Sequence, residues 1–312
     1  MKEISGFQRY KRNTPWLKYL LWKIMIYRRN HFNYYRILNP SIIDYKGRRL
    51  IAFRDFCPCN SFIRIAELAG NKILNVKQVL GEKGVSSVED PRFFLHKDKI
   101  HLSYVKGKWD SRAAQGGYSK MAYCVLDDDL SVSENKVFDG FEGIQKNWLF
   151  FESPEKKLYA ITYNHIQQIF DVENNIIIEN DFKIEWPSPK KDNPSDKGKE
   201  NIVGSVRGGS TPIFKDGEYY SFFHVTPIDK YKKSRVPNYC YEVGFYSFES
   251  SPPFRITGYT PDPIFTGNPY ALPNGAIFEK GKWLVSCGIN DVGWKLLKFD
   301  HNELLNKMVR VK

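Results

Sequence analysis

Apolar runs that meet a short polar turn and leave it as a second alternating run occur five times along the chain, at intervals of roughly 50–65 residues. The five copies begin at Asn39, Glu89, Lys146, Gly208 and Asn274. A period of this length is typical of radial or stacked repeat architectures, and alternating runs around tight turns are typical of antiparallel strands. We therefore expect an all-β fold, a five-bladed β-propeller, in which each copy supplies one blade.

A small or polar cluster opens every copy, at the same position relative to its first strand. Because the blades of a propeller surround a central channel, we expect the active centre to be assembled from one such segment per blade. The copies extend from about residue 37 to about residue 290. This predicts one catalytic propeller over residues 37–312, preceded by an extension over residues 1–36.

The N-terminal extension has a pattern of its own. Residues 16–27 (WLKYLLWKIMIY) carry apolar side chains at helical spacing and are framed by Lys and Arg. This predicts a basic amphipathic helix that is too short and too charged to cross a membrane. It packs on the rim of the propeller, or it contacts an anionic membrane through residues 10–30. No small-residue cleavage site follows the apolar stretch, which argues against a signal peptide.

The formal net charge of +12 over 312 residues suits a nucleic acid, an anionic substrate or a membrane surface. The sequence has no helix-turn-helix, zinc-finger or aromatic RNA-binding motif, so we expect no nucleic-acid partner and favour an anionic or lipid-linked substrate. Five cysteines without framework spacing predict reduced thiols and a cytoplasmic protein, peripheral to the inner face of the membrane if the extension binds lipid. We expect no metal site. Residues 186–204, rich in Pro, Asp, Lys and Asn, predict a long surface loop, either a lid or a plain insertion.

The second copy offers a candidate acid in Glu89-Asp90-Pro91-Arg92. Proline fixes its own φ and favours an extended backbone at the residue before it, so Asp90 is expected to be held stiffly at a strand entry. A rigid aspartate at the mouth of a pocket is suited to general acid catalysis, and burial in apolar surroundings would raise its pKa. The alternative is a turn carboxylate that pairs with Arg92.

The other copies offer groups that bind anions and sugars. Lys146-Asn147-Trp148 combines a cation for phosphate oxygens, an amide for sugar hydroxyls and an aromatic face for a sugar ring. His224 ends the fourth copy, although alternation alone also allows a core histidine. Asp291 follows the fifth copy, where a solvated turn is the alternative.

In order along the chain, these motifs resemble the glycoside hydrolase family 130 phosphorylases and the related protozoan mannosyltransferase-phosphorylases. NPSI from Asn39 and the strand ending at Arg54 resemble the first-blade segment of the family, and EDPR matches its most recognisable motif. The remaining matches are GGYSKMAYC around Lys120, KNWLFF from Lys146, FFHV at His224, the strand from Tyr241, and GINDVGW at Asp291. Lys120 replaces an arginine of the family, and Phe151 replaces a proline.

The resemblance implies a five-bladed propeller that transfers mannose between β-mannosides and phosphate or a sugar nucleotide. Asp90 would be the general acid. The phosphate-binding residues would be Lys120, Lys146 and His224. The sugar-binding residues would be Asn39, Ser41, Arg54, Arg92, Asn147, Tyr241 and Asp291. No resident cofactor is expected, because phosphate or the sugar nucleotide is itself a substrate.

Chemistry favours transfer over hydrolysis. A hydrolase normally places two carboxylates around the scissile bond, whereas here an amide (Asn39) and a cation (Lys146) stand where a base would be needed. The sequence therefore predicts a phosphorylase-like glycosyltransferase with a single acid and an anion pocket. It acts on an oligosaccharide or a lipid-linked glycan, in degradation or in surface polysaccharide synthesis. A non-catalytic glycan-binding propeller is the alternative.

Overall fold

The structure is a computed structural model of the whole chain. It describes residues 37–57, 60–70, 72–81, 87–108, 118–141, 145–164, 166–178, 184, 206–225, 241–265, 271–289 and 293–311. The predicted N-terminal helix, the proposed membrane contact through residues 10–30 and the predicted loop at 186–204 lie outside the described residues. The helix that the described part does contain, α3 (His301–Lys307), lies near the C-terminal end of the chain.

The first three blades are four-stranded antiparallel sheets in which consecutive strands are neighbours. Blade 1 comprises β1 (Ile37–Tyr45), β2 (Arg48–Cys57), β3 (Asn60–Ala69) and β4 (Lys72–Leu80). Blade 2 comprises β5 (Ser87–His96), β6 (Lys99–Lys108), β7 (Tyr118–Leu126) and β8 (Val132–Val137). Blade 3 comprises β9 (Leu149–Glu152), β10 (Leu158–Asn164), β11 (Ile166–Asp171) and β12 (Ile176–Ile178).

The last two blades depart from this plan. Blade 4 comprises β13 (Val206–Gly208), β14 (Ile213–Lys215), β15 (Glu218–Val225), β16 (Glu242–Glu249) and β17 (Ile256–Tyr259). Blade 5 comprises β18 (Ala271–Glu279), β19 (Lys282–Ile289) and β20 (Gly293–Asp300). Asp300 then caps α3 (His301–Lys307), and β21 (Val309–Arg310) pairs with β17. The end of the described chain therefore adds a strand to the outer edge of blade 4.

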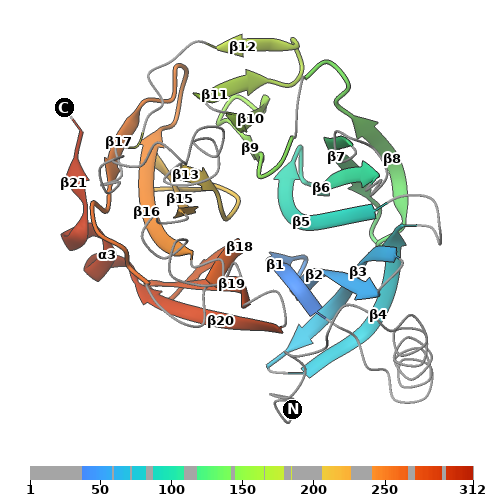
Figure 1. Cartoon of the computed structure of the whole chain (residues 1–312). Helices are drawn as coiled ribbons and strands as arrows, with labels where there is room; N and C mark the ends of the chain where they lie inside the picture. The colour runs from blue at the N-terminus through green and yellow to red at the C-terminus, as the bar shows by residue number, and fades with distance from the viewer. Residues whose placement is uncertain are drawn as a thin grey trace, which may run out of the picture.

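Figure 1 shows the five sheets arranged around a common centre, with β1, β5, β9, β13 and β18 innermost. Each of the five sequence copies forms the inner hairpin of one blade, so the predicted five-bladed propeller is confirmed. Lys46 and Gly47 both have positive φ, as do Lys280 and Gly281, at the turns of the first and fifth hairpins. Two successive positive φ angles match the right-handed twist of the strands on either side, which explains the tight turns that the sequence predicted.

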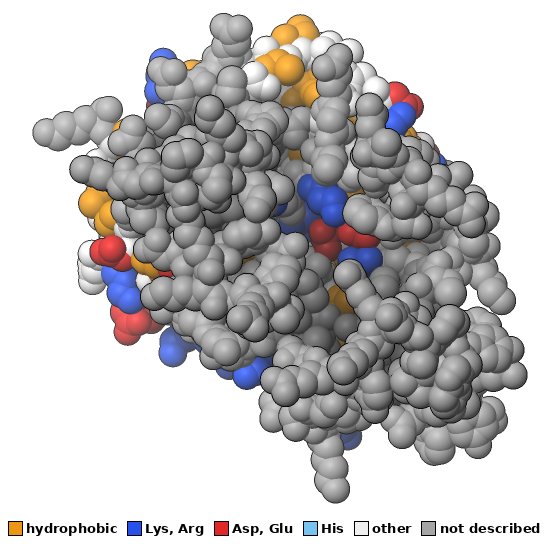
Figure 2. Space-filling model, in the orientation of Figure 1, with side chains coloured by type: hydrophobic (Ala, Val, Ile, Leu, Met, Phe, Trp, Pro, Cys, Tyr) orange, Lys and Arg blue, Asp and Glu red, His pale blue; other side chains and the backbone are white. Residues whose placement is uncertain are grey.

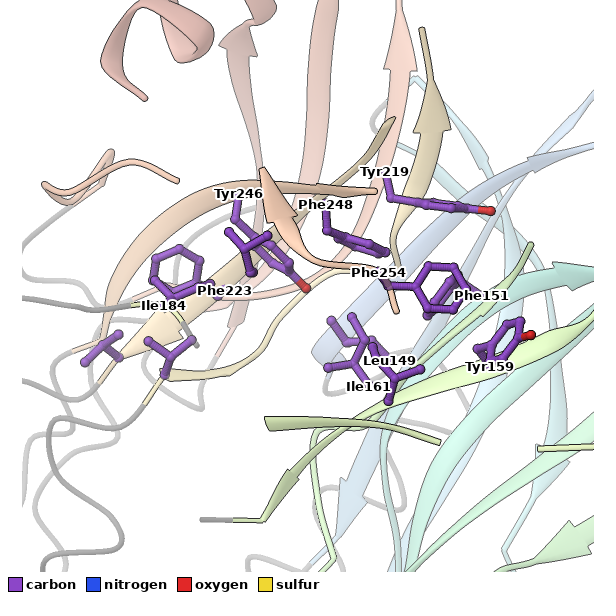
Figure 3. Close-up of a cluster of buried hydrophobic side chains, with 14 residues drawn as sticks. Leu149, Phe151, Tyr159, Ile161, Ile184, Tyr219, Phe223, Tyr246, Phe248 and Phe254 are labelled. Carbon is purple, nitrogen blue, oxygen red and sulfur yellow. The ribbon is translucent and has the colours of Figure 1, made fainter. Parts of the chain in front are cut away.

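Apolar side chains fill the interfaces between the blades. Figure 3 shows one such cluster, in which Leu149, Phe151 and Tyr159 of blade 3 pack against Tyr219 and other aromatic residues of blade 4. Phe151, which stands where the resembled family has proline, lies 5.0–5.4 Å from the rings of Tyr219, Phe248 and Phe254 (distances between ring centroids). These aromatic contacts therefore join blade 3 to blade 4.

Blades 1 and 5 come from opposite ends of the described chain and close the ring against each other. Apolar side chains of both blades share one cluster that includes Ile42, Phe53 and Ile277. The Ser286 hydroxyl donates to the Pro40 carbonyl over 2.7 Å, and both belong to buried strands. These contacts hold the first strand of blade 1 against blade 5 near the centre of the propeller.

Two further findings bear on the sequence predictions. Within the described ranges, no helix combines the length and hydrophobicity that crossing a bilayer requires. Cys124 and Cys287 are buried free thiols, as the expectation of reduced cysteines requires. Burial raises the pKa of Cys124 to about 12, so this thiol is inert at neutral pH.

Candidate active site at the centre of the propeller

Three strand entries carry an amide or a carboxyl residue in an unusual backbone conformation. Asn39, Asp90 and Asn147 have φ angles of +46°, +52° and +62°. The register shifts in blades 1 and 2 lie directly at Asn39 and Asp90, between Leu38 and Ser41 and between Glu89 and Arg92. A bulge re-aims a side chain, and Asn and Asp tolerate the left-handed region best among residues with a side chain. The expectation of an extended backbone at Asp90 is wrong, because the bulge places this residue in the left-handed region.

Asp90 lies buried against Asn39. The Asn39 Nδ2 donates to Asp90 Oδ1 over 2.7 Å, and the two side chains belong to residues that are 5% and 8% exposed. Gly288 of β19 leaves the space for this amide, since a Cβ there would collide with Asn39 Oδ1. The candidate acid is therefore held from blade 1, while blade 5 leaves room for the residue that holds it.

The charge balance around Asp90 differs from the prediction. Burial alone would raise its pKa, but the charges of Lys146, Arg54 and Arg92 and the Asn39 hydrogen bond outweigh burial and lower the pKa below its usual value. The sequence-based expectation of a raised pKa is therefore wrong for the protein without substrate. Apolar surroundings were assumed there, whereas three cations, one each from blades 1, 2 and 3, face this carboxylate.

Glu89, the neighbour of Asp90, lies between two of these cations. Arg54 Nη2 is 2.9 Å from Glu89 Oε1, and Lys146 Nζ is 3.3 Å from Oε2. The Arg54 Nε also donates to the Ser61 hydroxyl over 2.8 Å. Figure 2 shows Lys or Arg side chains on either side of Asp or Glu side chains in a hollow near the centre of one face.

Arg92 occupies the middle of the strand entries and is 1% exposed. Its guanidinium donates to four oxygens: Gly209 O (2.8 Å), Asp90 O (3.3 Å), Asn147 Oδ1 (3.1 Å) and Asn274 Oδ1 (3.1 Å). These acceptors belong to blades 2, 3, 4 and 5. Arg92, predicted to bind sugar, is thus placed as a buried connection between blades.

His224 lies deep in blade 4, opposite Arg207 in the pairing of β13 with β15. Its ring is 5.0 Å from that of Tyr241, between centroids. Burial, followed by the charges of Arg207 and Arg92, lowers the pKa of His224 well below its usual value. The imidazole is therefore neutral at pH 7 in the protein without substrate, and it can offer an anion an N–H donor rather than a charge.

The structure brings most of the predicted site residues together and places others elsewhere. The contacts above bring five predicted residues together: Asn39, Arg54, Asp90, Lys146 and Asn147. His224 lies close enough to this group for the charge of Arg92 to act on its imidazole. Asp291 lies outside the described residues.

Three further side chains serve other contacts. Ser41 is buried, and its hydroxyl accepts the Phe93 N–H over 3.0 Å, which ties blade 1 to blade 2. Lys120, on the third strand of blade 2, forms an ion pair with Asp139. Trp148 is fully buried and its indole donates to Gln145, so the hypothesis that it stacks on a sugar ring is wrong.

Comparisons of sequence give no relative: no protein-family model and no curated protein matches the chain. Comparison of structures, in contrast, finds similar proteins. The chain is similar to a β-1,2-mannobiose phosphorylase from Listeria innocua at 14% identity over 87% of this chain and 91% of that one, with a TM-score of 0.59. It is also similar to a GDP-Man-dependent mannosyltransferase from Leishmania mexicana, at 13% identity over 86% of both chains and a TM-score of 0.55. A putative glycoside hydrolase from Bacteroides ovatus ATCC 8483 aligns at 13% identity, over 86% of this chain and 88% of that one, with a TM-score of 0.60.

The chain has the fold of a GH130-type propeller. At these identities the likeness concerns the fold. The resemblance that was noted from short motifs is confirmed at that level, and the roles of individual residues stay predictions.

Three residues of this candidate site were not among the residues predicted from the sequence. Asn274 is fully buried at the entry of blade 5, Glu89 binds two cations, and Arg207 faces His224. Asn274 could have been found, because Asn274-Gly275 stands at the same phase of its copy as Asn39-Pro40 of the first. Among the described residues, no cluster of three or more His, Cys, Asp or Glu side chains could hold a metal ion.

Proposed function

We propose that the protein is a carbohydrate-active enzyme that transfers a glycosyl group, mannosyl by resemblance, between an anion and a glycan. The anion is inorganic phosphate or the diphosphate of a sugar nucleotide, and the glycan is an oligosaccharide or is lipid-linked. The observation that carries the proposal is the environment of Asp90. One buried carboxyl is held by an amide and faced by three cations, in a propeller whose fold is shared with mannoside phosphorylases.

The proposed reaction needs one acid. An oxygen of the anion attacks the anomeric carbon, the bond from that carbon to the glycosidic oxygen breaks, and Asp90 delivers the proton to the departing oxygen. A hydrolase would also need a carboxylate free to activate water. Glu89 is the adjacent carboxylate, and Arg54 and Lys146 engage both of its oxygens. This arrangement supports an anion as the nucleophile.

The binding groups are assigned by what they can donate. Lys146 is partly exposed, so it can turn from Glu89 to an anion, and Arg207 and His224 supply donors from blade 4. We assign Lys120 as a further phosphate ligand from the resemblance alone. Asn39, Arg54, Asn147, Tyr241 and Asp291 remain the proposed sugar-binding residues. Ser41 and Arg92 are withdrawn from this set, because both are buried and engaged in contacts between blades. No cofactor is proposed.

Turnover assays test this function. Incubation with phosphate and β-mannobiose is expected to release mannose 1-phosphate if the protein works in degradation, whereas use of a sugar nucleotide supports synthesis of a surface polysaccharide. Binding of glycans without turnover of any donor would favour the alternative, a non-catalytic glycan-binding module.

Lys146→Met is expected to raise the KM for the anion about tenfold or more, because one charge-assisted contact is lost.

Anion binding is expected to be coupled to proton uptake. An anion beside Lys146 offsets the charge that holds the Asp90 pKa low, so binding raises this pKa, and a proton is taken up at pH values between the free and the bound pKa. The affinity for sulfate should therefore rise as the pH falls from neutral to the usual pKa of an aspartate, about 4. Calorimetry in buffers of different ionisation enthalpy measures the uptake. Equal sulfate affinity at neutral pH and at about pH 4 would contradict the coupling.

The predictions of a cytoplasmic location and of a membrane contact through residues 10–30 rest on sequence alone. Residues 1–36 contain nine Lys or Arg and one Glu, a composition that suits an anionic surface. If that surface is a membrane, a lipid-linked acceptor would be close at hand, which favours synthesis.

A further inference from the structure

Asn274 connects blade 5 to both sides of the candidate acid. Its Nδ2 donates to the Asn39 carbonyl over 2.7 Å, and its Oδ1 accepts from Arg92 over 3.1 Å. The side chain is fully buried and stands at a register shift between Pro273 and Gly275. Both ends of the amide are therefore used, and each contact leads to a residue that touches Asp90.

These contacts close a circuit of hydrogen bonds around the centre. The Asn39 side chain donates to the Asp90 carboxylate, and Arg92 donates to the Asp90 carbonyl. Arg92 then donates to Asn274, which donates back to the Asn39 carbonyl. Further bonds from Arg92 to Asn147 and Gly209 tie blades 3 and 4 to the same guanidinium. All five blades thus meet through one buried cation and one buried amide.

We propose that Asn274 and Arg92 are positioning residues that fix Asp90 relative to Asn39 and to the groups that bind the anion. The inference rests on the proposed function for its catalytic meaning. The physical reason is that each blade is a separate sheet, so the entry of one blade can shift against the next unless side chains lock them together. A displacement of about 1 Å in a reacting group costs about 10²-fold in rate.

The circuit also acts through charge. Arg92 is one of the three cations that stabilise the ionised Asp90, and Asn274 holds the Arg92 guanidinium in place. When Asn274 is removed, Arg92 loses an acceptor and Asn39 loses a donor, so both groups that contact Asp90 gain freedom. The carboxylate then loses part of its stabilisation and its pKa rises. A residue that served stability alone would not move this titration.

The test compares Asn274→Ala with Ser286→Ala. Ser286 is equally buried and also joins blade 5 to blade 1, through the Pro40 carbonyl, without contacting Asp90, Asn39 or Arg92 through a side-chain bond. We expect Asn274→Ala to lower kcat about 10–100-fold, with a smaller change in the KM for phosphate, and to shift the titration of Asp90 upward. Ser286→Ala should reduce stability by a similar amount and leave that titration in place. The titration is followed by NMR of ¹³C-labelled aspartate, assigned with Asp90→Asn.

The outcomes separate the two proposals. A parent protein without turnover on any donor sinks the proposed function, but the Asp90 titration still tests the circuit. An unshifted titration in Asn274→Ala, or an equal shift in Ser286→Ala, overturns the positioning role. If Asn274→Ala fails to fold, Asn274→Ser, which keeps a polar side chain at this position, is judged by the same criterion.

Discussion

Asp90→Asn is expected to lower kcat by about 10²–10⁴-fold, because the amide cannot deliver the proton that the departing glycosidic oxygen needs. The substitution keeps the shape of the side chain, and its Oδ1 can still accept from Asn39 Nδ2. It also removes a negative charge that faces Lys146, Arg54 and Arg92. The anion should therefore bind at least as tightly as in the parent, so kcat falls while the KM for phosphate does not rise.

Glu89→Gln is the matched control for this prediction. Glu89 is the next residue and also a carboxylate, but it is engaged by Arg54 and Lys146 rather than by an amide. Its replacement removes the negative charge that both cations contact, so we expect altered anion affinity and a change in kcat of less than about tenfold. A Glu89→Gln variant without turnover beside an active Asp90→Asn variant would assign the acid to Glu89 and refute the role of Asp90.

The architecture was predictable because its signals are local. A tight turn such as Lys46-Gly47 and the alternation beside it depend on a few residues each, and their recurrence at one period fixes the number of blades. The direction of a side chain at a strand entry, in contrast, cannot be predicted from a few neighbouring residues. Asn147 has a positive φ that the sequence does not reveal, and Trp148, which follows it, is fully buried in an apolar cluster of blades 2 and 3.

The charge balance of the site was equally hidden. The predicted rise in the pKa of Asp90 considered burial in apolar surroundings alone. The lowering depends on Arg54 from blade 1 and on Lys146 from the entry of blade 3, each separated from Asp90 by tens of residues in the sequence. A sum over neighbours from three blades requires the fold. The presence of an acid in copy two was predictable, but the pKa of that acid was not.

Arg92→Met is expected to destabilise the folded protein by about 3–5 kcal/mol, the range found when one partner of a buried polar network is removed. Methionine fills a similar volume but donates nothing. The oxygens of Asp90, Asn147, Gly209 and Asn274 would each lose a donor, and an unpaired buried acceptor costs about 1–3 kcal/mol. The midpoint of urea unfolding, followed by tryptophan fluorescence, measures the loss.

Arg310→Met provides the comparison. Arg310 is 56% exposed at its side chain and pairs with Glu218 over 3.0 Å, so its replacement should cost less than about 1 kcal/mol. Arg92→Lys keeps the buried charge without the planar fork and should fall between the two, because an ammonium cannot reach acceptors from four blades at once. If Arg92→Met unfolds at the same urea concentration as Arg310→Met, the guanidinium does not hold the blades together, and the rigidity of the site must come from the apolar clusters between them.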